Sequence, residues 1–266
     1  MFSIHDAPDL YEAQFDKDTE LFGKLYHEHM AKGTPFKLVN ALDIAVQLMT
    51  QSVETGRIYQ TFTDHLNTHT PFKDKIRTSN LCLEIALPTE GYESVLDLYN
   101  ADAETGEVGL CTIGGLNAAE IKDDEQYAEC AYYSLLMIDN AISNSSYEFP
   151  HVAMTARKRM NAAVGLVGVA HWLAKQHLNY TTQKGRDAMY ELGETHYWHL
   201  VNASLKISKE RGVAEWMHKT KWIDGWLPID TYCKEIDNIV TVGRKRDWEG
   251  LRKQIIANGG IGGVVS

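Results

Sequence analysis

The sequence predicts a mixed α/β protein built on a parallel sheet or a barrel. Segments with apolar residues at helical spacing alternate with short apolar runs of strand length, and strands separated by helices pair in parallel. The 266 residues suffice for one large domain or two small ones, and the hydrophobic share of 44% is ordinary for a globular protein. No internal repeat or low-complexity linker divides the sequence.

Two helices are predicted before the first strand. The first covers residues 6–30, with Pro8 in its first turn and the helix breaker Gly33 after its end. The second covers residues 36–54 and is ended by Gly56. Its apolar stripe consists of Val39, Leu42, Val46 and Met49.

Strands alternate with helices in the rest of the chain. Strands are predicted at residues 57–63, 81–87 and 108–113. Helices are predicted at residues 123–144, 182–211 and 247–257, and a short apolar run at 164–169 continues into a helix through Lys175. Gly212 closes the longest of these helices. The apolar face of the helix at 123–144 carries Leu135, Ile138 and Ile142.

Charge and cysteine content exclude several classes of function. The net charge of −10 disfavours binding to nucleic-acid phosphates. No apolar run reaches the roughly 20 residues that span a bilayer, and the N-terminus has no signal-peptide pattern. The four cysteines, at spacings of 29, 19 and 103, form neither a disulfide framework nor a zinc motif. We therefore expect a cytoplasmic protein in a reducing environment, with no membrane or nucleic-acid partner.

The most informative segment is SNLCLEIALP, residues 79–88. If it is extended, Asn80, Cys82 and Glu84 share one face and the apolar residues share the other. Burying a carboxylate without partners costs several kcal/mol, so this pattern suits a small polar ligand held against a sulfur in a dry pocket. The simpler alternative is a strand with one solvated face.

Several motifs extend this signal along the chain. They are DLYEA (9–13), TGRIY (55–59), DHLNTHTPF (64–72), SNLCLEIALP (79–88), GLCT (109–112) and GWLPIDTY (225–232). Together they closely resemble the large, catalytic subunit of class I ribonucleotide reductase. Each motif alone is weak, but their shared order and spacing make chance resemblance improbable.

The resemblance implies a fold and a role for four residues. The fold would be part of a ten-stranded α/β barrel, with Cys82 on a loop inside it. Cys82 would form the thiyl radical that takes the 3′ hydrogen of a ribonucleoside diphosphate. Glu84 would act as base on the 3′ hydroxyl, and Asn80 would hydrogen-bond the sugar hydroxyls. Cys111 would belong to the redox pair that forms a disulfide as the 2′ position is reduced; taken alone, it would be interpreted as a buried, inert thiol.

The resemblance also implies missing parts. Residues 1–266 would be the middle piece of a split catalytic subunit, with the second redox cysteine and the effector sites upstream. The radical-passing tyrosine pair, the phosphate loop and the tail cysteines would lie downstream. We therefore expect the chain alone to be inactive and to expose a large apolar interface. The Gly-rich end, residues 259–266, is expected to pack little and to be mobile unless a partner orders it.

The expected partners follow from the same resemblance. They are complementing fragments of the catalytic subunit, a small subunit whose metal site supplies the radical, and a thioredoxin- or glutaredoxin-type dithiol. No cofactor or metal is expected in this chain itself. The competing hypothesis is a non-catalytic binding or inhibitory fragment that docks on the intact reductase.

Other constellations have simpler interpretations. Asp64, His65, Asn67 and His69 could suggest zinc, but the segment looks extended and lacks a further ligand pair, so hydrogen-bonded polar residues are the better interpretation. Tyr132 and Tyr133 are interpreted as helix packing, and residues 157–159 (RKR) as a solvated face or a salt-bridge donor.

The remaining glycines and cysteines are assigned structural roles or none. Residues 165–168 (GLVG) lack the third glycine of a dinucleotide loop and indicate close backbone packing. Gly114 and Gly115 would allow a close approach of the chain to substrate. Cys130 is interpreted as packing, and Cys233 matches no cysteine of the family.

Overall fold

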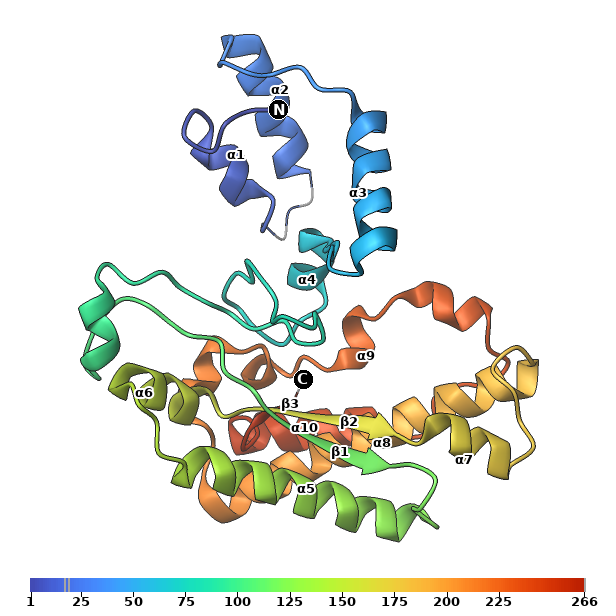
Figure 1. Ribbon diagram of the computed structural model, residues 1–266. Coiled ribbons are helices and arrows are strands. Elements are labelled where there is room, and N and C mark those ends of the chain that lie inside the picture. Colours follow the sequence, from blue (N-terminus) through green and yellow to red (C-terminus); the bar gives the residue numbers. More distant parts are fainter. Residues whose placement is uncertain (17, 19, 266) are drawn as a thin grey trace. The chain divides into compact units, whose positions relative to one another are not determined.

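The chain divides into two compact units in the computed structural model, which describes residues 1–265 except 17 and 19 (Figure 1). The first unit contains residues 1–70 and 75–87, and the second contains residues 71–74 and everything from residue 88 onward. Among the described residues, no helix is long and apolar enough to cross a membrane.

The first unit begins with two helices where one was predicted. These are α1 (Pro8–Ala13) and α2 (Leu21–Lys32). The side chain of Asp16 accepts the N–H of Asp18, and the side chain of Asp18 accepts the N–H of Glu20. These local hydrogen bonds compete with the helical ones, so the acidic run interrupts the helix expected over residues 6–30.

Helix α3 (Ala41–Thr55) starts later than predicted and ends as predicted. The side chain of Asn40 accepts the N–H of Leu42 at 3.0 Å and so sets the first turn. Gly56 ends the helix in the left-handed conformation. No residue of α3 is buried, so its apolar stripe lies at the surface of this unit.

The strand predicted at residues 57–63 is wrong. The described part of this segment is exposed and unpaired until α4 (Thr63–Thr68) begins. A strand requires a neighbour for its backbone hydrogen bonds, and the described chain provides none here. The motif at 64–69 is therefore mostly helical rather than extended.

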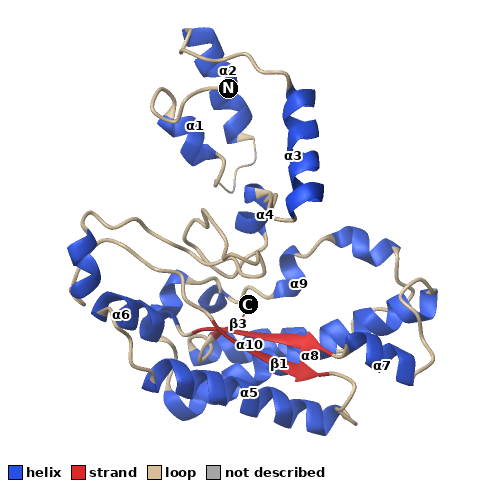
Figure 2. Ribbon diagram, in the orientation of Figure 1, coloured by secondary structure: helices blue, strands red, loops and turns tan. Residues whose placement is uncertain are grey.

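The second unit contains the parallel sheet that the alternating pattern predicts (Figure 2). Its strands lie in the order β1 (Thr112–Asn117), β2 (Asn161–Val167) and β3 (Val264–Val265), with Thr112 paired to Ala162. Strand β1 begins four residues later than predicted. Gly114 allows this strand to approach the next helix, because an added Cβ would lie only 3.2 Å from Ser134 and Ile138.

Two long helices, α5 (Asp124–Asn144) and α8 (Gln183–Arg211), pack against each other and against the sheet, as Figure 1 shows. Both match their predicted ranges, and Leu135, Ile138 and Ile142 are buried as expected. His196 of α8 donates from Nε2 to the carbonyl of Val164 in β2, at 2.7 Å, and accepts the hydroxyl of Tyr127 of α5. One side chain thus links both helices to the sheet.

The other elements of this unit are short or peripheral. Helix α6 lies where the sequence analysis predicts no element; it begins at Pro150, and proline suits the first turn of a helix. The α-helices are α6 (Pro150–Arg159), α7 (Val169–Lys175), α9 (Pro228–Thr231) and α10 (Trp248–Asn258). The 3₁₀ helices are η1 (Val95–Tyr99), η2 (Glu215–Lys219), η3 (Trp222–Asp224) and η4 (Lys234–Asn238).

The Gly-rich end packs more than its composition predicts. Ile261 is fully buried, and the N–H of Gly262 donates to the carbonyl of Ser204 in α8. Gly263 exchanges two hydrogen bonds with the hydroxyl group of Ser204. The expectation of little packing is therefore wrong for residues 260–263, and mobility of this end stays a prediction.

Candidate functional site

The segment that carries Cys82 forms a turn and not the strand predicted at residues 81–87. The N–H of Leu83 donates to the carbonyl of Asn80 at 3.1 Å, which places Cys82 third in a four-residue turn. Leu83 has a backbone φ of +62°, a value that residues other than glycine rarely adopt. Asn80 and Ser79 bind the backbone of Ile85 with their side chains, so these groups are not available to a strand partner.

The turn changes how the predicted site residues are displayed. Asn80, Cys82 and Glu84 are all exposed in this chain, and Leu81, expected on the opposite apolar face, is 85% exposed. The expected dry pocket with alternating faces is therefore wrong for this chain. Burial resumes at Ile85 and Leu87, which anchor the segment in the first unit.

Cys111 lies in the second unit, directly before β1, and is half-buried. Its thiol lies 3.7 Å from the carbonyl of Thr112. Asn161, at the start of the neighbouring strand, donates to the carbonyl of Leu110 at 3.4 Å. No disulfide joins the four cysteines of the described chain. Cys82 belongs to the first unit and Cys111 to the second.

Asn67 is fully buried, unlike Asp64, His65 and His69 of the same motif. Its amide donates to the carbonyl of Ile76 at 2.9 Å and accepts the N–H of Ile76 at 2.8 Å. The interpretation as a structural polar residue is confirmed for Asn67. Among the described residues, no cluster of metal-ligating side chains is present.

Of two other motifs, the tyrosine pair is only partly as interpreted and the basic cluster is as interpreted. Tyr132 donates its hydroxyl to Glu210 at 2.7 Å, but Tyr133 is exposed, so packing is wrong for the second tyrosine. In the basic cluster 157–159, Lys158 pairs with Glu215 at 2.7 Å. Arg159 is the buried salt-bridge donor: it is 2% exposed and binds Glu107 and Asp74, each at 2.6 Å. Burial lowers the pKa of Arg159, but the two carboxylates outweigh this effect and the net shift is upward.

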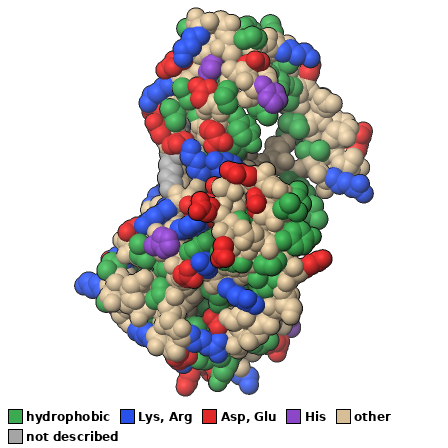
Figure 3. Space-filling view, turned by 90° about the vertical axis from the view of Figure 1, so that its left-hand side faces the viewer, with side chains coloured by type: hydrophobic (Ala, Val, Ile, Leu, Met, Phe, Trp, Pro, Cys, Tyr) green, Lys and Arg blue, Asp and Glu red, His purple; other side chains and the backbone are tan. Residues whose placement is uncertain are grey.

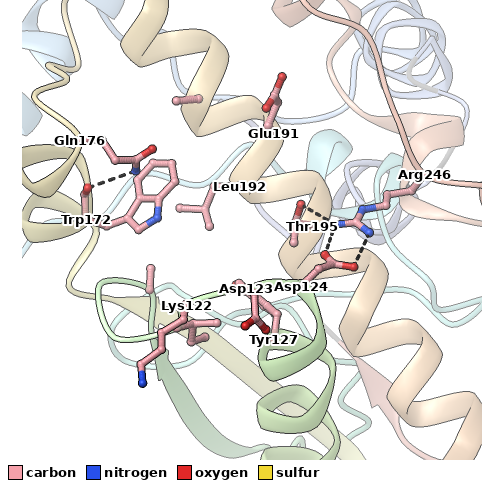
Figure 4. A pocket seen from close by; sticks show the side chains of 13 residues that line it. Lys122, Asp123, Asp124, Tyr127, Trp172, Gln176, Glu191, Leu192, Thr195 and Arg246 are labelled. Atoms are coloured by element: carbon pink, nitrogen blue, oxygen red, sulfur yellow. Dashed lines mark hydrogen bonds and ion pairs between the residues drawn. The ribbon is translucent and has the colours of Figure 1, made fainter.

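A cavity of about 260 Å³ lies where α5 begins, between α7 and α8 (Figure 4). Its wall holds an ion pair that sequence analysis missed: Arg246 donates two hydrogen bonds to Asp124 and a third to Thr195. Hydrogen bonding from Arg246 lowers the pKa of Asp124, and the same contact raises the pKa of Arg246. Because 122 residues separate the partners, no local pattern could have revealed this pair. The charges satisfy one another, which indicates a structural role.

A second hollow, of about 610 Å³, follows the outer edge of β1 and is mostly apolar. Gly114, Gly115 and Cys130 contribute to its wall, together with the exposed side chains of Ile113 and Met137. The glycines thus lie on an unpaired strand edge of the described chain, a surface to which another strand can add.

Comparison with known proteins decides the family. The family model for the ribonucleotide reductase barrel domain matches residues 1–263. The chain belongs to this family. The match covers both units, and it supports the α/β fold class that the parallel sheet indicates.

Curated relatives agree over almost the whole chain. The ribonucleoside-diphosphate reductase subunit alpha of Haemophilus influenzae is 35% identical over 259 residues, which is 96% of this chain and 33% of that protein. The subunit alpha of Enterobacteria phage T4 is 36% identical over 264 residues, which is again 96% of this chain and 33% of that protein. The Escherichia coli reductase 1 subunit alpha is 35% identical over 263 residues, which is 97% of this chain and 34% of that protein. The chain therefore spans about a third of the length of these relatives.

Proposed function

We propose that this chain supplies the central third of a ribonucleoside-diphosphate reductase catalytic subunit, which reduces ribonucleotides to deoxyribonucleotides for DNA synthesis. The observation that carries the proposal is the match of residues 1–263 to the reductase barrel domain, a range that includes every predicted site residue. In this proposal residues 1–266 form the central segment of a ten-stranded α/β barrel, and the turn with Cys82 is its interior loop.

The chemistry would be divided among four side chains. A thiyl radical at Cys82 takes the 3′ hydrogen atom of the ribose, while Glu84 takes the proton of the 3′ hydroxyl. The 2′ hydroxyl leaves as water, and Asn80 holds the sugar hydroxyls. Cys111 and a second cysteine from a complementing chain supply two electrons and two protons, one proton to the departing 2′ oxygen and one to the 2′ carbon, and become a disulfide. The hydrogen atom then returns from Cys82 to the 3′ carbon, and the proton returns from Glu84 to the 3′ oxygen.

Turnover in this scheme needs other chains. A metal-containing small subunit would generate the radical, and a thioredoxin- or glutaredoxin-type dithiol would reduce the disulfide in the cytoplasm. The exposure of Cys82 and Glu84 supports this requirement, because a radical must be shielded from water by further protein. We therefore expect this chain to turn over only together with complementing pieces of the catalytic subunit.

The test is reconstitution with those pieces and the small subunit. Cys82→Ser should abolish nucleotide reduction, whereas Cys233→Ser, which changes an exposed cysteine outside the proposed site, should leave it unchanged. Substantial activity in Cys82→Ser would contradict the assignment. A complex that assembles but never reduces nucleotides would favour a non-catalytic, inhibitory fragment, and turnover by the isolated chain would contradict the need for partners.

A further inference from the structure

Two neighbouring side chains hold both backbone groups of one residue in the Cys82 loop. The hydroxyl of Ser79 donates to the carbonyl of Ile85, and the amide oxygen of Asn80 accepts the N–H of Ile85 at 3.1 Å. Ser79 Oγ also lies 3.3 Å from Asn80 Oδ1. Residues 79 and 85 are thereby joined across the loop, with Cys82 between them.

The conformation inside the loop depends on this closure. The backbone of Leu83 lies in the left-handed region, which a residue with a Cβ adopts only when its surroundings impose it. Beyond the loop, Ile85 and Leu87 are buried, so the backbone that Ser79 and Asn80 hold is itself anchored in the first unit. The clamp thus connects an anchored segment to the exposed tip that carries Cys82.

The clamp also fixes which end of the Asn80 amide faces outward. The N–H of Ile85 can only donate, so the atom of Asn80 that faces it must be the carbonyl oxygen. The Nδ2 group is the end that remains for a ligand, and it can only donate. A ribose hydroxyl oxygen is an acceptor of the right kind for this group.

We infer that Ser79 and Asn80 form a clamp on Ile85 that sets the position of Cys82, and that Ser79 is a positioning residue for this cysteine. The inference rests on the proposed function, because it assigns a geometric role to a residue beside the proposed radical site. Radical transfer of a hydrogen atom requires close, oriented contact, and a displacement of about 1 Å can lower the rate by about 100-fold. Loss of one end of the clamp should therefore lower kcat and leave KM unchanged.

The first test is hydrogen exchange of the full 266-residue chain. Ser79→Ala should speed exchange at the Leu83 and Ile85 amides by about tenfold, the effect of losing one net hydrogen bond. Ser79→Thr keeps the hydroxyl and should restore protection. The control is Thr78→Ala, since the hydroxyl of Thr78 contacts only the carbonyl of Ser79, at 3.3 Å. Protection of the Ile76 amide, which Asn67 binds, reports whether the first unit is still folded.

The second test uses the reconstituted reductase. Ser79→Ala should lower kcat by about tenfold at unchanged KM, and Ser79→Thr should recover most of it. Asn80→Asp keeps the oxygen acceptor but removes the Nδ2 donor, so Ile85 should stay protected while turnover falls. Thr78→Ala should behave like the unmodified chain in both tests.

The outcomes separate the two hypotheses. Activity in Cys82→Ser would reject the proposed function, whatever Ser79 does. If Cys82→Ser is inactive but Ser79→Ala keeps normal exchange or normal kcat, the clamp is rejected and the proposed function stands. If Asn80→Asp exposes the Ile85 amide to exchange, the assigned orientation of the Asn80 amide is rejected.

Discussion

At the scale of single residues, the best-defined interaction in the second unit is the buried cation of Arg159. Its guanidinium binds Glu107, which is only 7% exposed, and Asp74, and it lies 5.2 Å from the ring of Trp216. Removing one member of a buried ion pair strands the other charge in a poorly solvated site. The three residues come from separate parts of the sequence, so the cluster also holds the segment at residues 71–74 to the rest of this unit.

We predict that Arg159→Met destabilises the second unit by about 3 kcal/mol, because it leaves the buried Glu107 with Lys219, 3.9 Å away, as its remaining cation. The measurement is urea unfolding followed by tryptophan fluorescence, since all six tryptophans lie in the second unit. Arg157→Met, which changes an exposed residue of the same cluster, should lower the free energy of unfolding by less than about 1 kcal/mol. The double variant Arg159→Met with Glu107→Met should recover part of the loss, and strictly additive losses would contradict the ion-pair explanation.

At the scale of elements, His196 links α5 and α8 to β2 in its neutral form. Burial lowers the pKa of His196 below its ordinary value of 6.5. A histidine whose folded pKa is depressed contributes full stability above the unfolded pKa and loses it as the pH falls toward the folded pKa. The stability of the second unit should therefore decline as the pH is lowered below about 6.5.

We predict that His196→Gln removes part of this pH dependence. At pH 7.5 the variant should be less stable by about 2 kcal/mol, because Tyr127 and the carbonyl of Val164 lose a matched partner. The difference in the free energy of unfolding between the variant and the unmodified chain should narrow as the pH is lowered from 7.5 to 5.5. It is again measured by tryptophan fluorescence in urea. His171→Gln, on an exposed position of α7, is the control. Equal slopes against pH in all three proteins would show that His196 is not the titrating group.

At the scale of the whole molecule, apolar side chains reach the surface in many places, and several such patches are visible on the face drawn in Figure 3. Helix α3 is the clearest case, because none of its residues is buried. One stripe along it, exposed by 56–87%, consists of Leu42, Val46, Met49 and Val53. Soluble monomers rarely expose contiguous apolar surfaces of this kind, so we expect this stripe to be covered in an assembly.

We predict that the isolated chain self-associates. We also predict that it binds complementing reductase chains through an interface that buries well above about 1,600 Å² of accessible surface. Sedimentation velocity of the purified chain should show this concentration-dependent association. Val46→Lys with Met49→Lys should reduce it without loss of helix content, because both side chains are exposed. Gln51→Lys, on the opposite side of α3, should have little effect. A monomer at high concentration with cooperative unfolding and no binding of apolar dyes would contradict the prediction.

The sequence by itself determined the features that depend on neighbouring residues. Helix ends followed from local groups such as Gly56 and Gly212, and the long helices α5, α8 and α10 from their apolar periodicity. The order of helices and strands predicted a parallel sheet, and the motif around Cys82 indicated the family that the comparisons then identified. All of these signals lie within a few residues or within one fixed order along the chain.

Only the tertiary structure decided the features that join distant residues or choose between local alternatives. The extent of β1 depends on pairing with β2, 50 residues away, and the partners of Arg159 lie 52 and 85 residues away. The alternation around Cys82 predicted a strand, but a strand needs a paired neighbour. Because the described residues of this unit offer none, the side chains of Ser79 and Asn80 bind the backbone groups of Ile85, and the segment folds into a turn.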